Sequence, residues 1–140
     1  MRPHRALRPL LALLVFAAGG CRGATDPDPL VGTWLATTFE ITSAGQGRTN
    51  VLASGGTLGL NVASNFVTTG TLIVPAALNG GTTFTASLAG TATRTNNVVH
   101  FDQPADTFMR NLTFTLVENR LEATAQVVGT ATYDVILTRQ

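Results

Sequence analysis

The stretch LVGTWL (residues 30–35) separates a proline-rich segment from about a hundred residues of strand-like sequence. The preceding residues, DPDP (26–29), include two prolines, which lack a backbone N–H and favour extended geometry in the residue before them. Trp34 is the only tryptophan in 140 residues, and its large ring suits a small core. Gly32 would let another backbone or ring approach closely. The stretch therefore predicts the first strand of a folded domain, beginning near Leu30.

After this stretch the sequence alternates between apolar and polar residues, as half-buried strands do. In FTASLAGTATR (84–94) the even positions are mostly apolar, and the odd positions are nearly all small or Thr/Ser. The segments LTFTL (112–116) and YDVIL (133–137) repeat this alternation. No long amphipathic helix pattern is present, so an all-β fold is expected. About eight strands are predicted, near residues 33–42, 57–63, 66–74, 83–94, 98–102, 107–117, 120–127 and 130–139.

Short turn sequences separate these strands, at residues 43–47, 79–81, 96–97, 118–119 and 129. Short connections favour antiparallel pairing of neighbouring strands, so an antiparallel meander is expected. Closing the meander into a barrel would pair the first strand with the last and remove the edges that promote aggregation. A closed barrel is the favoured arrangement, and a sandwich or half-open barrel is the alternative.

The last predicted strand ends at Arg139, which in a closed barrel would lie over the Trp34 ring. A guanidinium stacked on indole contributes roughly 0.5–2 kcal/mol. Gly32, Trp34 and Arg139, together with the strand count, resemble the lipocalin and wider calycin families. Members have a G-x-W at the start of the first strand and a basic residue near the end of the barrel, packed on that tryptophan. The resemblance covers residues 30–139 and implies a minimal lipocalin-like domain.

An export signal precedes the domain. Residues 1–20 combine three arginines with an apolar run, LLALLVFAA (10–18), that is too short to span a bilayer but fits a secretory signal. Cys21, the only cysteine, follows two glycines and resembles the lipidated cysteine of a bacterial lipobox. The resemblance implies that acyl chains on Cys21 anchor the mature protein in a membrane. Residues 21–29 would form the tether and residues 30–140 the barrel. The alternatives are a retained membrane anchor and an ordinary signal followed by a free thiol.

Arg22 follows the lipidated position, where an aspartate is the usual inner-membrane retention signal in enteric-type sorting. By that resemblance the protein is expected at the outer membrane, facing the periplasm. The full chain carries nine basic and eight acidic residues, and removal of the three signal arginines leaves a net charge of about −2. A weakly acidic domain is not expected to bind nucleic acid.

No residues are predicted to form a catalytic or metal site. His100, the only histidine beyond the signal, shares a strand face with Asp102, and Asp106 is nearby. A stable metal site needs three or four ligands, so a surface or barrel-rim histidine is the favoured interpretation. No serine lies in a recognisable nucleophile elbow. Neither an enzymatic activity nor a cofactor is therefore expected.

Aromatic residues on the apolar strand faces are the candidates for lining a ligand cavity. Eight-stranded barrels are either packed solid or hold one small ligand, and both remain open here. A cavity would be covered by the loop at residues 43–54, and the scarcity of inward charges suits a neutral ligand. The leading hypothesis is non-catalytic binding of a small apolar or lipid-like ligand. The alternative is a structural or assembly lipoprotein that binds an envelope protein through its outer surface. The candidate lining residues are Phe66, Phe84, Ala86, Phe108, Phe114 and Tyr133.

Overall fold

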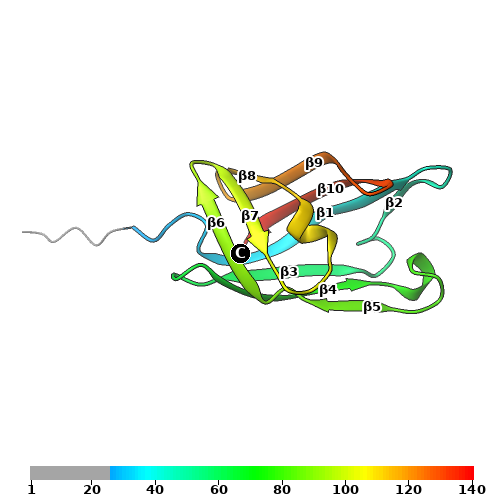
Figure 1. Cartoon of the computed structure of the whole chain (residues 1–140), viewed down its shortest axis with the longest axis horizontal. Coiled ribbons are helices and arrows are strands. Elements are labelled where there is room, and N and C mark those ends of the chain that lie inside the picture. The colour runs from blue at the N-terminus through cyan, green and yellow to red at the C-terminus, as the bar shows by residue number, and fades with distance from the viewer. Residues whose placement is uncertain (1–25) are drawn as a thin grey trace, which may run out of the picture.

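The computed structural model describes residues 26–140, and the expected all-β class is confirmed (Figure 1). No helix among these residues has the length and apolar character needed to cross a membrane. The described chain contains two short 3₁₀ helices, η1 (Ala76–Leu78) and η2 (Phe108–Asn111). Its strands are β1 (Gly32–Ser43), β2 (Gly47–Asn50), β3 (Thr57–Val62), β4 (Val67–Val74), β5 (Phe84–Ser87), β6 (Gly90–Thr95), β7 (Val98–Asp102), β8 (Phe114–Val117), β9 (Arg120–Val128) and β10 (Ala131–Arg139).

Eight of the strands form a closed antiparallel barrel, as predicted, in the order β1-β3-β4-β6-β7-β8-β9-β10. The ring closes through an antiparallel ladder between β1 and β10, which runs from Trp34 opposite Arg139 to Ser43 opposite Ala131. The sandwich alternative is therefore wrong. Closure satisfies the backbone hydrogen bonds of the first and last strands, which would otherwise be exposed edges.

Two additional strands, β2 and β5, widen one end of the barrel. β3 pairs with the beginning of β1, whereas β2 pairs with its second half. In the same way, β6 pairs with the first residues of β4 and β5 pairs with residues 71–74. Gly70 lies at this branch with φ +152°, and a Cβ there would lie 2.2 Å from the Gly59 carbonyl oxygen. Only glycine fits such a close approach, so Gly70 lets β4 lie against β3 at the level where its other side changes partner from β6 to β5.

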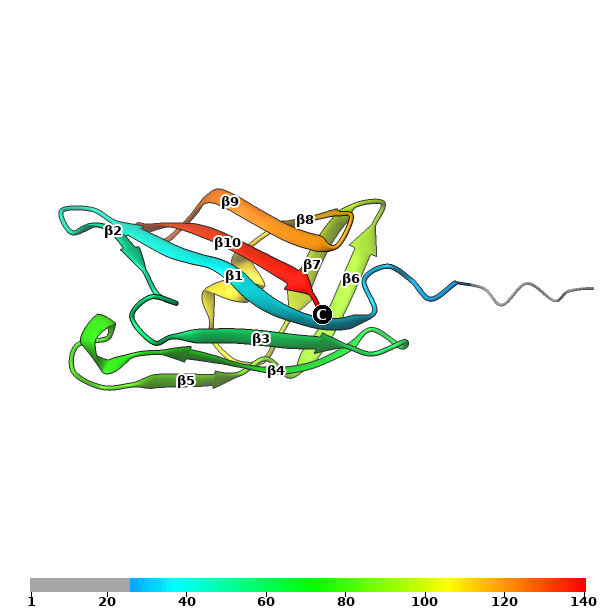
Figure 2. The same ribbon diagram turned by 180° about the vertical axis from the view of Figure 1, so that it is seen from behind.

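The two ends of the barrel differ, and Figure 2 shows both. The N-terminal segment enters at one end, here called the tether end, beside the turns at residues 63–66, 96–97 and 118–119. The opposite, wider end is called the mouth end. It carries the β1–β2 turn, η1 and the β9–β10 turn, and the segment containing η2 lies nearer the middle of the barrel.

Two of the predicted strands are divided in the structure. The segment predicted as one strand over residues 83–94 forms β5 and β6. The two are separate because β4 pairs with β6 through residues 67–68 and with β5 through residues 71–74. The segment predicted as a strand over residues 107–117 begins with η2. Asp106 and Arg110 form an ion pair of 2.6 Å at the i,i+4 spacing, which favours a helical turn there.

Apolar side chains fill the barrel through its middle and tether end. Phe101 and Phe114 pack edge to face with ring centroids 5.4 Å apart. The packed-core interpretation therefore describes most of the interior, and any ligand space must lie nearer the mouth end. The largest fully buried side chains are Trp34, Phe39, Phe101, Phe114, Leu30, Leu60, Leu72, Leu88, Met109, Leu112, Leu121 and Leu137.

Candidate ligand site at the barrel mouth

The three motif residues meet at the tether end. Trp34 is fully buried, and its Nε1 donates a hydrogen bond of 2.9 Å to the carbonyl oxygen of Leu30. Arg139 lies opposite Trp34 in the β1–β10 register, and a Cβ on Gly32 would lie 2.9 Å from its Nε. Its guanidinium also donates a 2.6 Å hydrogen bond to the carbonyl oxygen of Val31. Arg139 thus holds the entering chain against the barrel, while its stacking on the indole stays a prediction.

A recess of about 260 Å³ lies at the opposite end and is here called the mouth recess. β1, β4, β5 and β10 supply its apolar walls, and η1 and the segment around η2 cover its sides. The lining residues are Ile41, Leu72, Val74, Leu78, Asn79, Phe84, Asp106, Thr107, Phe108 and Tyr133.

Two stacked aromatic rings, Phe108 and Tyr133, form one wall of the mouth recess. Phe108 and Tyr133 stack with centroids 4.5 Å apart and an interplanar angle of 18°. Phe39, which is fully buried, packs against Phe108 at 5.2 Å. Burial raises the pKa of the Tyr133 hydroxyl above its ordinary value, because the ionised form would lose hydration. The wall is therefore uncharged at neutral pH.

A second recess of about 370 Å³, here called the side recess, adjoins the first and shares Ile41 and Leu78 with it. Ser43, Gln46 and Thr49 supply hydroxyl and amide groups to its lining. The segment at residues 43–54, predicted to be a covering loop, contains β2 and forms one wall of this recess. Its Val51 is fully buried, and the Val51 amide donates a 2.8 Å hydrogen bond to the Phe39 carbonyl oxygen. These contacts tie the segment to the barrel.

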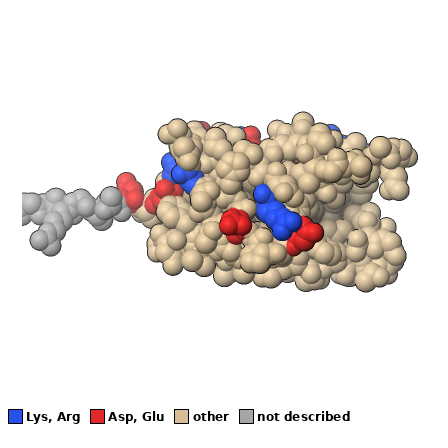
Figure 3. Space-filling view, in the orientation of Figure 1, with Lys and Arg blue, Asp and Glu red and all other residues tan. Residues whose placement is uncertain are grey.

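Charged groups are scarce at the mouth recess. Asp106 is the only charged residue in its lining, and that exposed carboxylate pairs with Arg110. Thr107 also lines the recess, and its buried hydroxyl has no hydrogen-bond partner among residues 26–140. Charged atoms are also sparse over the face of the barrel seen in Figure 3. An apolar pocket with a few hydroxyl groups suits a neutral molecule.

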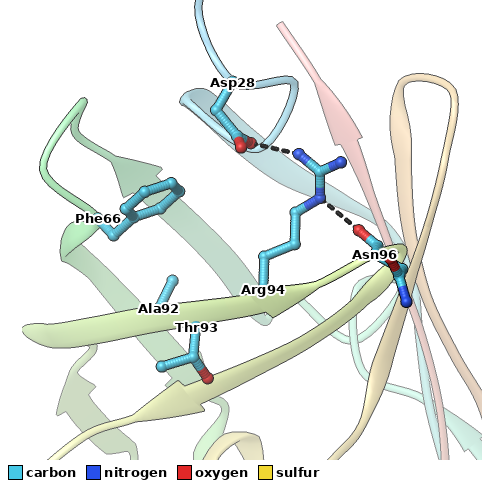
Figure 4. A pocket seen from close by; sticks show the side chains of 6 residues that line it. All are labelled: Asp28, Phe66, Ala92, Thr93, Arg94 and Asn96. Atoms are coloured by element: carbon cyan, nitrogen blue, oxygen red, sulfur yellow. Dashed lines mark hydrogen bonds and ion pairs between the residues drawn. The ribbon is translucent and has the colours of Figure 1, made fainter.

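The structure brings together three of the six predicted lining residues, Phe84, Phe108 and Tyr133. Ala86 and Phe114 face inward but belong to the buried core. Phe66 lies at the tether end, where it lines a different hollow (Figure 4). The alternating pattern does not specify how far along the barrel axis a residue lies, so it could not identify the other lining residues. They are Ile41, Leu72, Val74, Leu78, Asn79, Asp106 and Thr107.

His100 and Asp102 share the outer face of β7, and both are exposed. Within residues 26–140, no group of three or more His, Cys, Asp or Glu side chains is arranged to hold a metal ion. Cys21 lies outside the described residues.

Scans against protein families, curated proteins and solved structures find no match to this chain. Its function is therefore inferred from the barrel and its mouth.

Proposed function

We propose that this protein is a lipid-anchored barrel of the bacterial cell envelope that binds a small, neutral, apolar or lipid-like ligand without catalysis. The mouth recess is the observation that carries the proposal. It opens at the flared end of a closed eight-stranded barrel, and aliphatic and aromatic side chains make up most of its lining. The resemblance of Gly32, Trp34 and Arg139 to the lipocalin motif supports the same function.

The dimensions of the mouth recess restrict the ligand. Its volume of about 260 Å³ is close to the lower end of the range for small-molecule pockets, about 300–1,000 Å³. A single ring system or a short acyl segment fits this space, and a longer chain would extend past Ile41 and Leu78 into the side recess. A charged group would lose its hydration there, and the one carboxylate in the lining, Asp106, is already paired with Arg110, so the buried part of the ligand is neutral.

Membrane anchorage through Cys21 is the second part of the proposal. Residues 26–29 join the barrel at the tether end, opposite the mouth recess (Figure 2). An anchor just before these residues would leave the mouth open toward the aqueous compartment. Arg22 after the lipidated position supports placement at the outer membrane, facing the periplasm.

The test is a titration of the purified full-length protein with the neutral dye N-phenyl-1-naphthylamine, combined with native mass spectrometry for co-purified ligands. Leu78→Arg places a charge in the lining shared by both recesses, at a side chain that is 36% exposed and therefore tolerant of substitution. Val127→Arg is the matched control, because Val127 is 71% exposed on β9 and lines neither recess.

We expect Leu78→Arg to weaken dye binding by about tenfold or more, because a bound dye would cover the guanidinium, and burying a polar group without a partner costs roughly 1–3 kcal/mol. Val127→Arg should bind as the parent does. Binding at the mouth recess is wrong if the parent neither enhances dye fluorescence nor carries a ligand, or if both variants bind equally well.

One observation favours the alternative, an envelope lipoprotein that binds another protein. β5 pairs only with β4, and its residues Phe84–Ser87 carry no charge that would protect the free edge. Such an edge can accept a strand from a partner. Thr85→Lys would block strand addition and leave the mouth recess intact, because Thr85 is exposed and does not line it. Loss of a co-purifying envelope protein in Thr85→Lys, with no dye binding by the parent, would favour the alternative.

A further inference from the structure

Exposed valines are concentrated around the tether end of the barrel. Val67 begins β4, Val98 begins β7 and Val117 ends β8, so each lies beside one of the three turns at that end. Their exposed fractions are 43%, 40% and 37%. Both views of the barrel place these three turns at the end where the N-terminal segment enters (Figures 1 and 2). An exposed valine therefore lies beside each of these three turns, and Val67, Val98 and Val117 are here called the apolar ring.

Phe66 adds an aromatic side chain to the same end. It occupies the β3–β4 turn with φ +61°, a left-handed conformation that is an outlier for a bulky residue. Two hydrogen bonds hold it there, from its amide to the Ala63 carbonyl oxygen at 2.9 Å and from the Ala92 amide to its own carbonyl oxygen at 2.8 Å. Its half-buried ring faces a hollow of about 530 Å³, beside Arg94 (Figure 4). Unfavourable backbone conformations that persist in a fold are often functional.

Charges at the tether end nearly balance. Asp28 and Arg94 form an ion pair at 2.7 Å, and Arg120 pairs with Glu122 at 3.0 Å. Glu118 is exposed in the β8–β9 turn. Among residues 26–140, the remaining charged residues at this end are Asp26, which is exposed, and Arg139, which bonds to backbone carbonyl groups. This balance removes electrostatic attraction to an anionic surface, so contact with lipid must rest on the apolar residues.

The tether limits how far this end can move from a membrane. Asp28 is fixed to the barrel by Arg94 and by the Leu30 amide, which donates a 2.8 Å hydrogen bond to its carboxylate. If Cys21 is lipidated, only the six residues 22–27 separate the anchor from this fixed point, which is seven Cα–Cα steps away. A fully extended chain of that length spans at most about 25 Å. The apolar ring is therefore held at high local concentration next to the bilayer.

We propose that the tether end docks on the phospholipid bilayer, with Val67, Val98, Val117 and the Phe66 ring seated at the boundary of headgroups and acyl chains. The barrel then stands with its mouth directed away from the lipid. Burial of apolar side chains at this boundary favours docking, and the anchor makes even weak burial effective. The inference depends on the proposed lipidation of Cys21 and is independent of ligand binding at the mouth recess.

The test uses the full-length lipidated protein in vesicles of phosphatidylethanolamine and phosphatidylglycerol that contain bromine-labelled acyl chains. A single cysteine replaces either Val98 or Val127 and carries an environment-sensitive nitrobenzoxadiazole label. Lipidation consumes the thiol of Cys21, so the new cysteine is the only labelling site. Val127 is the matched control, since it is a more exposed valine near the mouth end of the same barrel.

We expect the brominated lipid to quench the label at position 98 at least about threefold more than the label at position 127. This difference should persist in high salt, because the charges nearly balance. Equal quenching at both positions, stronger quenching at position 127, or none at either would overturn the docking proposal.

An unlabelled variant supplies a second measurement. This triple variant combines Val67→Thr, Val98→Thr and Val117→Thr. The substitutions conserve side-chain shape at exposed sites, so the barrel should fold. Hydrogen exchange at the β3–β4 turn should slow when the parent is reconstituted in vesicles, and this protection should be lost in the triple variant.

Flotation of the vesicles separates the two proposals. Protein that does not float overturns the anchor and docking together, whereas protein that floats without quenching or protection overturns docking alone.

Discussion

Gly32 is the residue at which the entering chain, the first strand and the last strand meet. Its φ of +145° lies in a region that side chains rarely adopt, and a Cβ would lie 2.9 Å from Nε of Arg139. The glycine of the G-x-W motif is therefore required by the backbone and by Arg139 together. Arg139 in turn donates hydrogen bonds to the carbonyl oxygens of Pro29 and Val31. A substitution at Gly32 would therefore weaken the contacts that hold the entering chain against the barrel.

We predict that Gly32→Ala destabilises the protein by about 1–3 kcal/mol, the usual cost of an unfavourable backbone conformation. Urea unfolding followed by Trp34 fluorescence measures the change. Gly59→Ala is the control, because a Cβ there meets only the flexible end of the Leu35 side chain, at 3.1 Å. Equal stability losses in the two variants would contradict this explanation.

Asp28 makes the stability of the tether end depend on pH. Partial burial acts to raise its pKa, but the Leu30 amide and the Arg94 guanidinium outweigh that effect and hold the pKa below its usual value of 3.8. A carboxylate with a lowered folded-state pKa contributes stability above its unfolded pKa, and this contribution is lost as pH falls through the folded value. The effect is modest because about one third of the side chain is exposed.

We predict that the parent loses more stability than Asp28→Asn as pH falls from about 6 to 3, since only the parent carries this carboxylate. Above pH 5 the parent should be the more stable of the two. Urea unfolding at several pH values measures both differences. Parallel stability curves for the two proteins would show that the Asp28–Arg94 contact contributes nothing.

At the scale of elements, the division of β4 between β5 and β6 decides where the barrel is filled and where it is open. Ala86 on β5 lies opposite Leu72 and belongs to the buried core, although Phe84 two residues earlier lines the mouth recess. The boundary between packed core and recess therefore falls within this one short strand. A larger side chain at Ala86 would meet packed neighbours.

We predict that Ala86→Trp destabilises the barrel by roughly 1–3 kcal/mol or more, because overpacking forces neighbouring side chains to move. Thr85→Trp is the control, since the neighbouring residue points to the opposite, exposed face of the strand. Thermal unfolding of both variants provides the comparison. If Ala86→Trp is as stable as its parent but does not bind dye, the ligand cavity lies deeper in the barrel than the mouth recess.

At the scale of the whole molecule, the tether and the mouth lie at opposite ends of one barrel. We predict that Cys21→Ser abolishes membrane association and leaves the signal uncleaved by the lipoprotein peptidase, because the proposed lipid acceptor is gone. Fractionation after high-salt washing and the intact mass of the protein measure the outcome. Cys21→Ser protein that stays with the membranes and has its mature mass would show that the lipoprotein proposal is wrong.

Local patterns were sufficient to predict the all-β class and several turns, whereas the closure of β1 on β10 was predicted from the general advantage of removing exposed edges. Alternation with a period of two specifies which face of a strand is buried, and turn residues such as Asn96 and Glu118 adopt the positive φ values that end strands. These properties depend on neighbours in sequence. They are therefore readable without knowledge of the tertiary structure.

Only the tertiary structure decided which inward residues fill the core and which line the mouth recess. Phe66, Phe84 and Phe114 were predicted to share one cavity, yet they lie at the tether end, the mouth recess and the packed core respectively. Alternation specifies the face of a strand but not its level along the barrel axis. That level depends on strand tilt and register, which are set by pairing between distant segments and by the branch of β4 at Gly70.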